Sequence, residues 1–273
     1  MHHHVTPPPK AKKGLSWVWI FLCGLLIVFV ILFLYWCSSI YTPNTPNTST
    51  TSTTTPTMTL MNPHSFFTRP IQPRPANEPV YKVIHGLLSP EECDKLLQIS
   101  LEKGFTGSTV RNYDTDSSYR VSETCWIKPN TNPHVQALYD KVEKLCGYDQ
   151  KWFEDLQVVH YTPGGYFRKH YDQCDPSESY CKDQVQRFKG YRLYTILMAL
   201  NDNFEGGGTY FHHDKNLVRL KQGDALIFQN VHFDSQDPTK CIIEPRSMHE
   251  GIKLESGDRY IATVWVRGTA TTL

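Results

Sequence analysis

The segment YTPGGYFRKHYD, residues 161–172, carries the pattern on which the rest of the chain is interpreted. Its Pro-Gly-Gly string indicates a tight turn, and the residues after it predict a strand over 166–172. His170 and Asp172 are two positions apart, so in a strand both side chains point to one face and can bind one ion. Two histidines and one carboxylate on one face of an octahedron form the site of non-haem Fe(II) oxygenases. The segment therefore predicts a metal site that takes its third ligand from elsewhere in the chain.

Helix signals precede this segment, and strand signals follow it. Ser89 is a helix cap followed by Pro90, and Gly104 ends that helix. Asn132 caps a second helix, predicted over Pro133–Cys146. Period-two patterns, separated by turn residues, predict strands at 157–161, 166–172, 191–200, 208–213, 217–220, 224–230, 246–253 and 259–267. We predict an α+β, mainly β fold: a double-stranded β-helix, or jelly roll, with flanking helices.

The N-terminal region has the composition of a membrane anchor. Residues 15–36 contain no charged side chain, and as a helix they would span roughly 33 Å, enough for the hydrocarbon core of a bilayer. Three lysines within residues 10–13 precede this run, and no Lys or Arg follows it before Arg69. The positive-inside rule then predicts a single-pass type II membrane protein whose C-terminal domain lies across the membrane from the cytosol, in the lumen. We expect its location to be the membrane of the endoplasmic reticulum. A cleaved signal peptide is the alternative, because small serines follow the run.

These features divide the chain into four parts. We expect a cytosolic tail at 1–14, a transmembrane signal anchor at 15–37, a Thr/Ser/Pro-rich stalk at 38–79 and a catalytic domain at 80–273. The formal net charge of +1 gives no reason to expect a nucleic-acid partner, because proteins that bind nucleic acids usually have a clustered basic face.

The chain has eight cysteines. Cys23 and Cys37 belong to the predicted membrane segment, and a lumenal location permits disulfides among the others. Cys174 and Cys181 lie close together in a polar stretch, so we predict that they pair. The other four are Cys93, Cys125, Cys146 and Cys241, for which free buried thiols are the alternative.

Further motifs accompany the metal segment in a consistent order. Arg120-Val121-Ser122, followed by Trp126, lies upstream. Downstream lie ALN (199–201), GGGTYF (206–211), GDALIF (223–228), MHEG (248–251) and GDRY (257–260). Together with the metal segment, these strings resemble the prolyl 4-hydroxylase family of Fe(II)- and 2-oxoglutarate-dependent dioxygenases. The resemblance covers residues 80–268.

The resemblance implies the full set of metal ligands. His170 and Asp172 match the first two, and His249 matches the distal histidine, so these three are the predicted catalytic ligands of Fe(II). His232 is the rival of His249, but it lacks the following glycine and a basic residue at the right spacing.

The resemblance also implies contacts to the cosubstrate. Arg259, ten residues after His249, would bind the distal carboxylate of 2-oxoglutarate, because a guanidinium can donate two hydrogen bonds to one carboxylate. Tyr161 matches a tyrosine that contacts the cosubstrate in relatives, and Thr195 is a further candidate for the distal carboxylate. The implied cofactors are Fe(II), 2-oxoglutarate and O₂, with ascorbate as an auxiliary reductant.

Three functions compete at this point. The favoured one is a membrane-anchored peptidyl-prolyl 4-hydroxylase that acts on collagen-like or Pro-rich proteins of the secretory pathway, with release of succinate and CO₂. Many prolyl 4-hydroxylases have Lys where this chain has Arg259, and the ALN, GGG and HEG strings are also similar to lysyl hydroxylases, so lysine is an alternative substrate. The third is a catalytically inactive, membrane-tethered binding module, although no metal ligand is lost in this sequence. The oligomeric state stays open.

Overall fold

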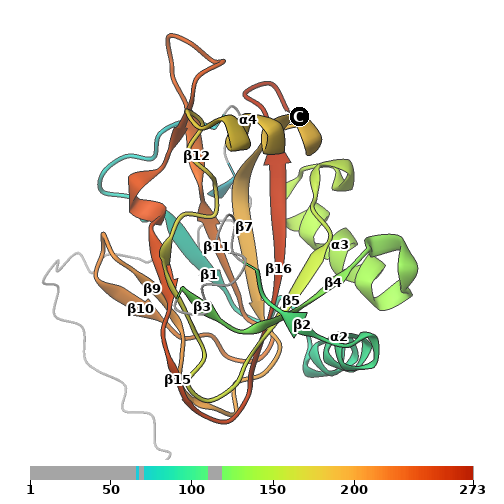
Figure 1. The fold of residues 1–273 in the computed structure, drawn as a ribbon. Coiled ribbons are helices and arrows are strands. Elements are labelled where there is room, and N and C mark those ends of the chain that lie inside the picture. Colours follow the sequence, from blue (N-terminus) through green and yellow to red (C-terminus); the bar gives the residue numbers. More distant parts are fainter. Residues whose placement is uncertain (1–65, 68–70, 110–118, 273) are drawn as a thin grey trace, which may run out of the picture. The chain divides into compact units, whose positions relative to one another are not determined.

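Two antiparallel β-sheets form the centre of the fold (Figure 1). The computed structural model describes residues 66–67, 71–109 and 119–272, which belong to a compact unit spanning Thr59–Leu273. The larger sheet has the strand order β1-β11-β7-β16-β5-β4-β2, and the smaller sheet has the order β10-β9-β14-β6-β3. This mainly β architecture agrees with the predicted jelly roll.

The strands of the larger sheet are β1 (Tyr81–Ile84), β2 (Thr106–Gly107), β4 (Glu123–Ile127), β5 (Leu156–Tyr161), β7 (Tyr191–Ala199), β11 (Ala225–Gln229) and β16 (Arg259–Gly268). Those of the smaller sheet are β3 (Arg120–Val121), β6 (Tyr166–His170), β9 (Thr209–Phe211), β10 (Asn216–Val218) and β14 (His249–Gly251). Two short pairs join β12 (Val231–Phe233) to β13 (Cys241–Ile243), and β8 (Glu205–Gly206) to β15 (Leu254–Ser256). Every predicted strand is present, whereas the strands that were not predicted are β1, β2, β3, β4, β8, β12, β13 and β15.

Both predicted helices form where their caps indicated. α2 (Pro90–Lys103) begins with a capping box, in which the Ser89 side chain accepts from the Glu92 amide and the Glu92 side chain accepts from the Ser89 amide. α3 (Pro133–Cys146) begins at Asn132, whose side chain accepts a hydrogen bond from the His134 amide. A further helix, α4 (Ser179–Arg187), was not predicted; no side-chain cap marks its start.

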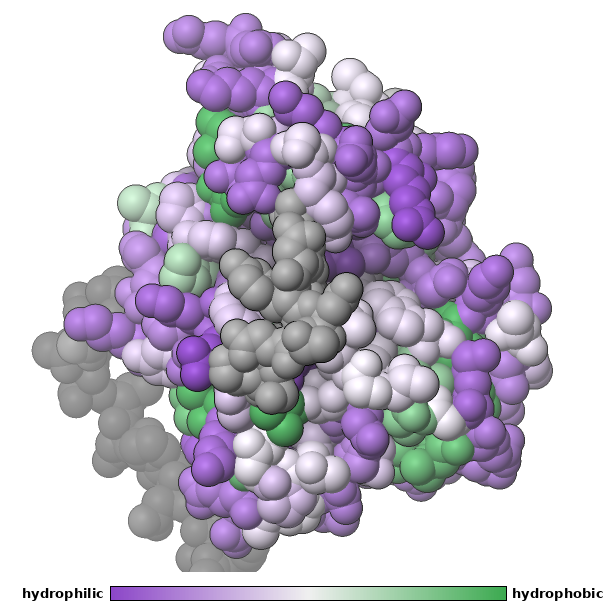
Figure 2. Space-filling model, in the orientation of Figure 1, coloured by the Kyte–Doolittle hydropathy of each residue, from purple (hydrophilic) through white to green (hydrophobic). Residues whose placement is uncertain are grey.

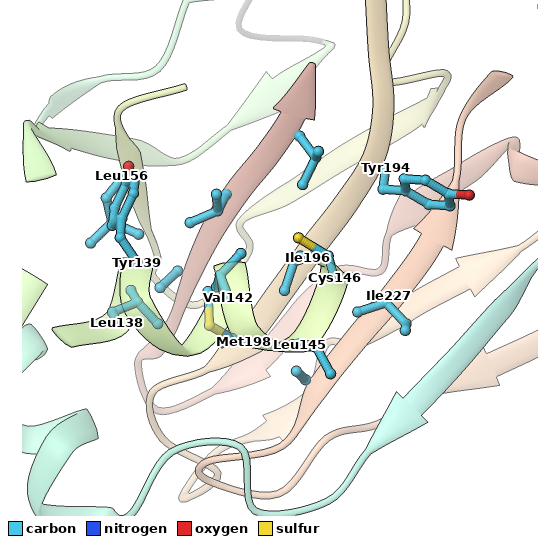
Figure 3. Packing of buried hydrophobic residues seen from close by; sticks show 14 of the residues in the cluster. Leu138, Tyr139, Val142, Leu145, Cys146, Leu156, Tyr194, Ile196, Met198 and Ile227 are labelled. Carbon is cyan, nitrogen blue, oxygen red and sulfur yellow. The ribbon is translucent and has the colours of Figure 1, made fainter. Parts of the chain in front are cut away.

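The larger sheet packs in two directions, because alternate residues of each strand face opposite sides. On β7, Tyr194, Ile196 and Met198 join the core that α2 and α3 cover (Figure 3). Leu197, between them, faces the smaller sheet and joins a second core. The first core takes the apolar stripe of α3, and the second encloses the candidate site.

Part of the predicted stalk belongs to the packed domain. Phe66, Phe67 and Ile71 are buried in the first core, and both phenylalanine rings contact Tyr194. Packing therefore begins N-terminal of residue 80, where we had expected the domain to start. The predicted anchor at 15–37 lies outside the described residues, and no helix within those residues is long and apolar enough to cross a membrane.

The predicted pairing of Cys174 with Cys181 is confirmed by a disulfide between them. The remaining four cysteines of the described residues form no disulfide and are buried: Cys93, Cys125, Cys146 and Cys241. Burial raises the pKa of the Cys93 thiol to about 11 and that of Cys241 to about 12, so both stay protonated and unreactive at neutral pH.

Candidate metal centre

Three side chains from the predicted ligand set meet between the two sheets. His170, Asp172 and His249 bring one ligand atom each within 4.8 Å of the others. The Nε2 atom of His170 lies 3.5 Å from Oδ1 of Asp172, and Nε2 of His249 lies 3.9 Å from the same oxygen. His232, the rival of His249, lies on β12 and is not part of this cluster.

Backbone carbonyls orient both imidazole rings. Nδ1 of His170 lies 2.7 Å from the Arg168 carbonyl oxygen, and Nδ1 of His249 lies 2.8 Å from the Ser247 carbonyl oxygen. Each Nδ1 must carry the proton to donate to a carbonyl, which leaves Nε2 with its lone pair toward the cluster. Burial, followed by the charge of His170, lowers the pKa of His249 to about 4. The ring is thus neutral at physiological pH, which is the form that binds metals.

The two histidines meet because their strands pair. His249 on β14 lies directly opposite His170 on β6 in the register of the smaller sheet, and the ring centroids are 4.3 Å apart. Asp172 joins them from beyond the strand: β6 ends at His170, so the prediction of a strand through residue 172 is wrong by two residues. The prediction that His170 and Asp172 bind one ion therefore named the right two residues. The reason is different, because Asp172 is positioned by the turn after β6 and not by side-chain alternation within the strand.

The carboxylate of Asp172 is held by its second oxygen. Oδ2 accepts hydrogen bonds from the Thr195 hydroxyl at 2.5 Å and from the Trp265 indole N–H at 3.0 Å, so Oδ1 is left to face the two histidines. Thr195 and Trp265 are cross-strand partners on β7 and β16. Burial alone would raise the pKa of Asp172, but the contact with His170 and nearby positive charges outweigh it and hold that pKa far below its usual value. The ligand is therefore an ionised carboxylate.

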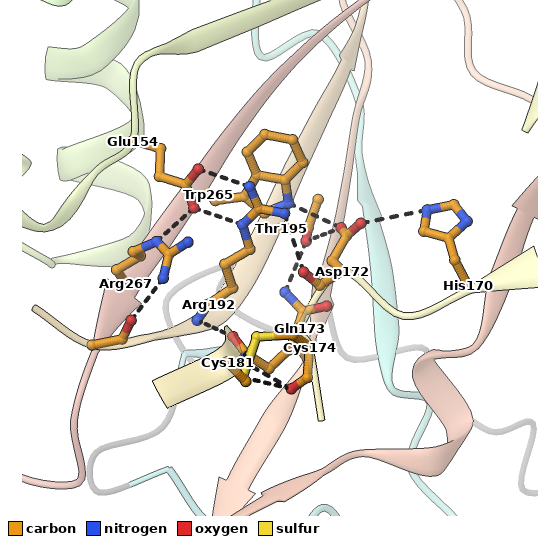
Figure 4. A network of polar contacts seen from close by, with 12 residues as sticks. Glu154, His170, Asp172, Gln173, Cys174, Cys181, Arg192, Thr195, Trp265 and Arg267 are labelled. Carbon is orange, nitrogen blue, oxygen red and sulfur yellow. Dashed lines mark hydrogen bonds and ion pairs between the residues drawn. A yellow bond between two sulfur atoms is a disulfide. The ribbon is translucent and has the colours of Figure 1, made fainter. Parts of the chain in front are cut away.

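A buried ionic network supports the chain at Asp172 (Figure 4). Glu154 accepts two hydrogen bonds from Arg192, at 2.6 and 2.8 Å, and one from Arg267, at 2.6 Å. Arg192 also donates to the Asp172 carbonyl oxygen at 3.1 Å, and its guanidinium lies 3.6 Å from the centre of the Trp265 ring. The network ties the residue that bears the carboxylate to the middle of the larger sheet.

The disulfide is linked to the same network. Gln173 donates to the Cys174 carbonyl oxygen at 3.1 Å and accepts from the Arg192 backbone amide at 2.8 Å. The chain that follows the metal ligand is thereby attached to both the disulfide and β7, as Figure 4 shows.

Arg259 is a buried cation on the wall of the pocket. It is 6% exposed, and burial lowers its pKa. Among the residues that the structure describes, no carboxylate lies within ion-pair distance of its guanidinium, whose central carbon lies 5.4 Å from the centre of the Tyr161 ring. Gly207 leaves room for this side chain, since a Cβ there would lie 3.2 Å from Cδ of Arg259. A buried guanidinium without a carboxylate partner is suited to binding an anionic ligand.

The three predicted cosubstrate residues line one pocket with the metal ligands. Tyr161 and Arg259 are cross-strand partners on β5 and β16, and the pocket wall also includes Thr195, His170, Asp172 and His249. The hydroxyl of Thr195 donates to Asp172 and accepts a hydrogen bond from Asn230 at 2.8 Å. These contacts give Thr195 a role beside the metal ligand, and its contact with 2-oxoglutarate stays a prediction.

Known proteins with similar sequences assign this site to a family. The family model of the 2OG-Fe(II) oxygenase superfamily matches residues 156–267, which include all three candidate ligands. A protein of Acanthamoeba polyphaga mimivirus, whose name assigns it provisionally to the prolyl 4-hydroxylases, is 33% identical over 193 residues, which cover 71% of this chain and 75% of the relative. The chain belongs to the prolyl 4-hydroxylase family. Prolyl 4-hydroxylase 1 of Arabidopsis thaliana is 30% identical to it over 209 residues, 69% of each chain.

Solved structures agree with a prolyl 4-hydroxylase fold. The viral collagen prolyl hydroxylase of Paramecium bursaria Chlorella virus-1, solved in complex with 2OG, has a TM-score of 0.54 and 26% identity, and the match covers 70% of this chain and 97% of that one. A Pseudomonas putida prolyl-4-hydroxylase, with a TM-score of 0.50 and 14% identity, shares the fold. This member of the prolyl 4-hydroxylase family is therefore a dioxygenase that uses Fe(II) and 2-oxoglutarate. The three ligand atoms fit Fe(II), and Arg259, which has no carboxylate partner among the described residues, fits the anionic cosubstrate.

Several residues of this prolyl 4-hydroxylase site were not assigned a role from the sequence. They are Glu154, Arg192, Arg267, Trp265, Gln173 and Asn230. One signal could have found the two arginines: each lies in a strand whose other residues are mostly apolar, where a charged side chain needs a partner. Arg120 stood in a recognised motif but had no role; it lines the pocket and donates to the Ser122 hydroxyl at 2.8 Å.

Proposed function

We propose that His170, Asp172 and His249 hold Fe(II) in this chain and that Arg259 binds the distal carboxylate of 2-oxoglutarate. The observation that carries this proposal is that three ligand atoms line a single pocket together with a buried cation, which has no carboxylate partner in the described part of the chain. When bound, iron and 2-oxoglutarate supply the oxidative chemistry that inserts oxygen into a C–H bond. The chain's own residues orient the ligands, neutralise the carboxylate and exclude water from a largely buried site.

We propose that the substrate is a proline residue in a peptide or protein, and that collagen-like or Pro-rich chains of the secretory pathway provide it. The names of the relatives support proline, and the viral structure is described as a collagen prolyl hydroxylase. Arg259 and the strings shared with lysyl hydroxylases keep lysine as the second candidate.

The proposed location is the lumen of the endoplasmic reticulum, with residues 15–37 as a signal anchor. The uncharged run and the lysines before it support this topology, and the Cys174–Cys181 disulfide is typical of an oxidising compartment. Protease treatment of sealed microsomes tests it: residues 80–273 should be protected until detergent is added, and their digestion without detergent would refute the topology.

Peptide hydroxylation tests the proposed activity. The full chain, with Fe(II), 2-oxoglutarate and ascorbate, is incubated with matched peptides that contain either proline or lysine, and mass spectrometry locates any added oxygen. We expect hydroxyproline and succinate in equal amounts, both lost in His170→Ala. Hydroxylysine alone would favour the second candidate, and succinate without a hydroxylated peptide would show that the substrate class is wrong.

A further inference from the structure

The segment before β1 is held to the domain mainly by its backbone. We call residues 71–78 the N-terminal strap. Between the buried residues Ile71 and Val80, every residue except Arg74 is exposed to solvent. The face of the molecule drawn in Figure 2 is mostly hydrophilic, with hydrophobic residues in small groups, so it offers a strap of this kind little apolar surface. Hydrogen bonds to the carbonyl groups of the strap therefore determine where it lies.

One arginine side chain donates three of these hydrogen bonds. Nη1 of Arg246 donates to the carbonyl oxygens of Pro75 at 3.2 Å and Glu78 at 3.0 Å, and Nη2 donates to that of Arg74 at 3.1 Å. Nε and Nη2 also donate to the two carboxylate oxygens of Glu244, at 2.8 and 3.1 Å. A guanidinium has five N–H donors, and these contacts use all of them. Arg246, whose side chain is 12% exposed, thus connects the strap to a buried carboxylate.

The same arginine belongs to the turn that leads to a metal ligand. This turn is the short 3-10 helix η4 (Pro245–Ser247), capped by the Glu244 side chain, which accepts from the Arg246 amide. The Ser247 hydroxyl donates to the Glu244 carbonyl oxygen at 2.7 Å, and the Ser247 carbonyl oxygen accepts from Nδ1 of His249 at 2.8 Å. The pairing of β14 with β6 is irregular between His249 and Gly251. The regular ladder therefore does not determine the ring orientation alone, and η4 contributes to it.

We propose that Arg246 is a positioning residue for the metal ligand His249, and that the N-terminal strap is the fixed point from which it acts. This inference rests on the proposed function, because it takes His249 as a ligand of Fe(II). The strap carbonyls hold the guanidinium, the guanidinium holds η4, and a carbonyl of η4 orients the imidazole. The metal centre thereby depends on residues of the expected stalk, outside the catalytic domain that the sequence predicted.

The expected size of the effect follows from the number of steps between Arg246 and the metal. Replacing a group that contacts a metal ligand directly typically lowers metal affinity by about ten- to a hundredfold. Arg246 acts one step further out, through Ser247, so we expect a loss of about three- to tenfold.

Metal titration of the full chain, without cosubstrate or turnover, tests the proposal. Arg246→Met removes all five donors and should weaken Mn(II) binding by about three- to tenfold. It should also shift the absorption bands of the Co(II)-substituted protein, because the position of one ligand changes. Arg246→Lys keeps a charge beside Glu244 but loses the planar fork of donors. It should therefore lose less affinity, and it provides the measurement if Arg246→Met does not fold.

Leu138→Ala is the matched control for a general loss of stability. Leu138 is buried in the first core, on α3, so its truncation destabilises the domain without changing η4 or the strap. The Mn(II) affinity and the Co(II) spectrum of Leu138→Ala should match those of the wild type.

A double variant tests the part played by the strap. Ile71→Ala loosens the buried end of the strap and leaves the Arg246 side chain unchanged. It should weaken Mn(II) binding in the wild type, but should have no further effect in Arg246→Met, because two residues that act along one path are not additive. Additive losses would overturn the role of the strap.

His249→Ala separates a failure of this inference from a failure of the proposed function. Its Mn(II) affinity should collapse; if it does not, His249 is not a ligand and both proposals are wrong. If it does, an unchanged Mn(II) affinity and Co(II) spectrum in Arg246→Met, or an equal loss in Leu138→Ala, would overturn the positioning role of Arg246 and leave the proposed function intact.

Discussion

Replacing Arg259 by leucine should have opposite effects on folding and on cosubstrate binding. Without a cosubstrate, a cation that is 6% exposed and has no carboxylate partner among the described residues opposes folding, because burial disfavours its charge. Arg259→Leu removes that cost and retains apolar contact with the walls of the pocket. We therefore expect the unliganded variant to be at least as stable as the wild type, but to bind 2-oxoglutarate more weakly.

The size of the second effect follows from the lost charged hydrogen bonds. One such bond contributes about 1.5–3 kcal/mol, so the affinity for 2-oxoglutarate should fall by at least about tenfold. At a cosubstrate concentration of about 100 Kd, the wild type gains about 2.7 kcal/mol, and a tenfold weaker site gains about 1.4 kcal/mol. For a domain of this size, the difference corresponds to a Tm shift smaller by about 3–5 °C.

Thermal unfolding with and without 2-oxoglutarate measures both effects, with Mn(II) in place of Fe(II) to prevent turnover. Arg259→Lys should keep part of the shift, because it retains a point charge but not the two-pronged donor. Arg219→Leu is the control, since Arg219 is exposed on the surface. A full 2-oxoglutarate shift in Arg259→Leu would refute the assignment of the cosubstrate anchor. A large loss of stability in the unliganded variant would instead show that Arg259 has a structural partner.

Three further predictions concern the surroundings of the metal ligand. Trp265→Phe removes the indole donor to Asp172 and should lower metal affinity by about tenfold or more, measured by titration with Mn(II). Glu154→Gln removes the only carboxylate that pairs with buried Arg267 and partly buried Arg192 among the described residues, and it should cost about 3–5 kcal/mol of unfolding free energy. Burial alone would raise the pKa of Glu154, but the arginine charges outweigh it and lower that pKa. The ionised Glu154 therefore contributes its full stabilisation above the ordinary glutamate pKa and loses it as pH falls through the lowered value. In urea titrations, the unfolding free energies of the wild type and the variant should become equal only in acid. Replacing both Cys174 and Cys181 by Ser opens a short loop and should cost about 2–3 kcal/mol, with retained stability contradicting this estimate.

Local signals predicted the parts of the fold that depend on local chemistry. The Ser89 capping box and the Asn132 cap placed α2 and α3 at their observed starts, because a cap satisfies amides within its own first turn. α4 has no such cap, and the polar stretch around the disulfide gave no periodic signal. β1 was missed for a different reason: its register with β11 joins residues far apart in the sequence, and four residues give little alternation to detect.

The same distinction applies to the site. The three metal ligands were predicted because they stand in recognisable strings, and the structure brings all three together. Their supports came from long-range contacts that no string contains: Glu154 meets Arg192 and Arg267 only when β7 and β16 pair. The hydrogen bond from Thr195 to Asp172 likewise depends on the approach of two sheets.

Strand register is the physical link between the core and the chemistry. On β16, Val264 faces the core under the helices, and the next residue, Trp265, faces the pocket and holds Asp172 together with its cross-strand partner on β7, Thr195. Because side chains alternate with period two, a slip of one residue between these strands would exchange the two faces. It would bring an apolar side chain to Asp172 and expose the indole N–H to an apolar core. The packing of α2 and α3 on the outer face therefore determines the register, and through it the position of the carboxylate that completes the metal site.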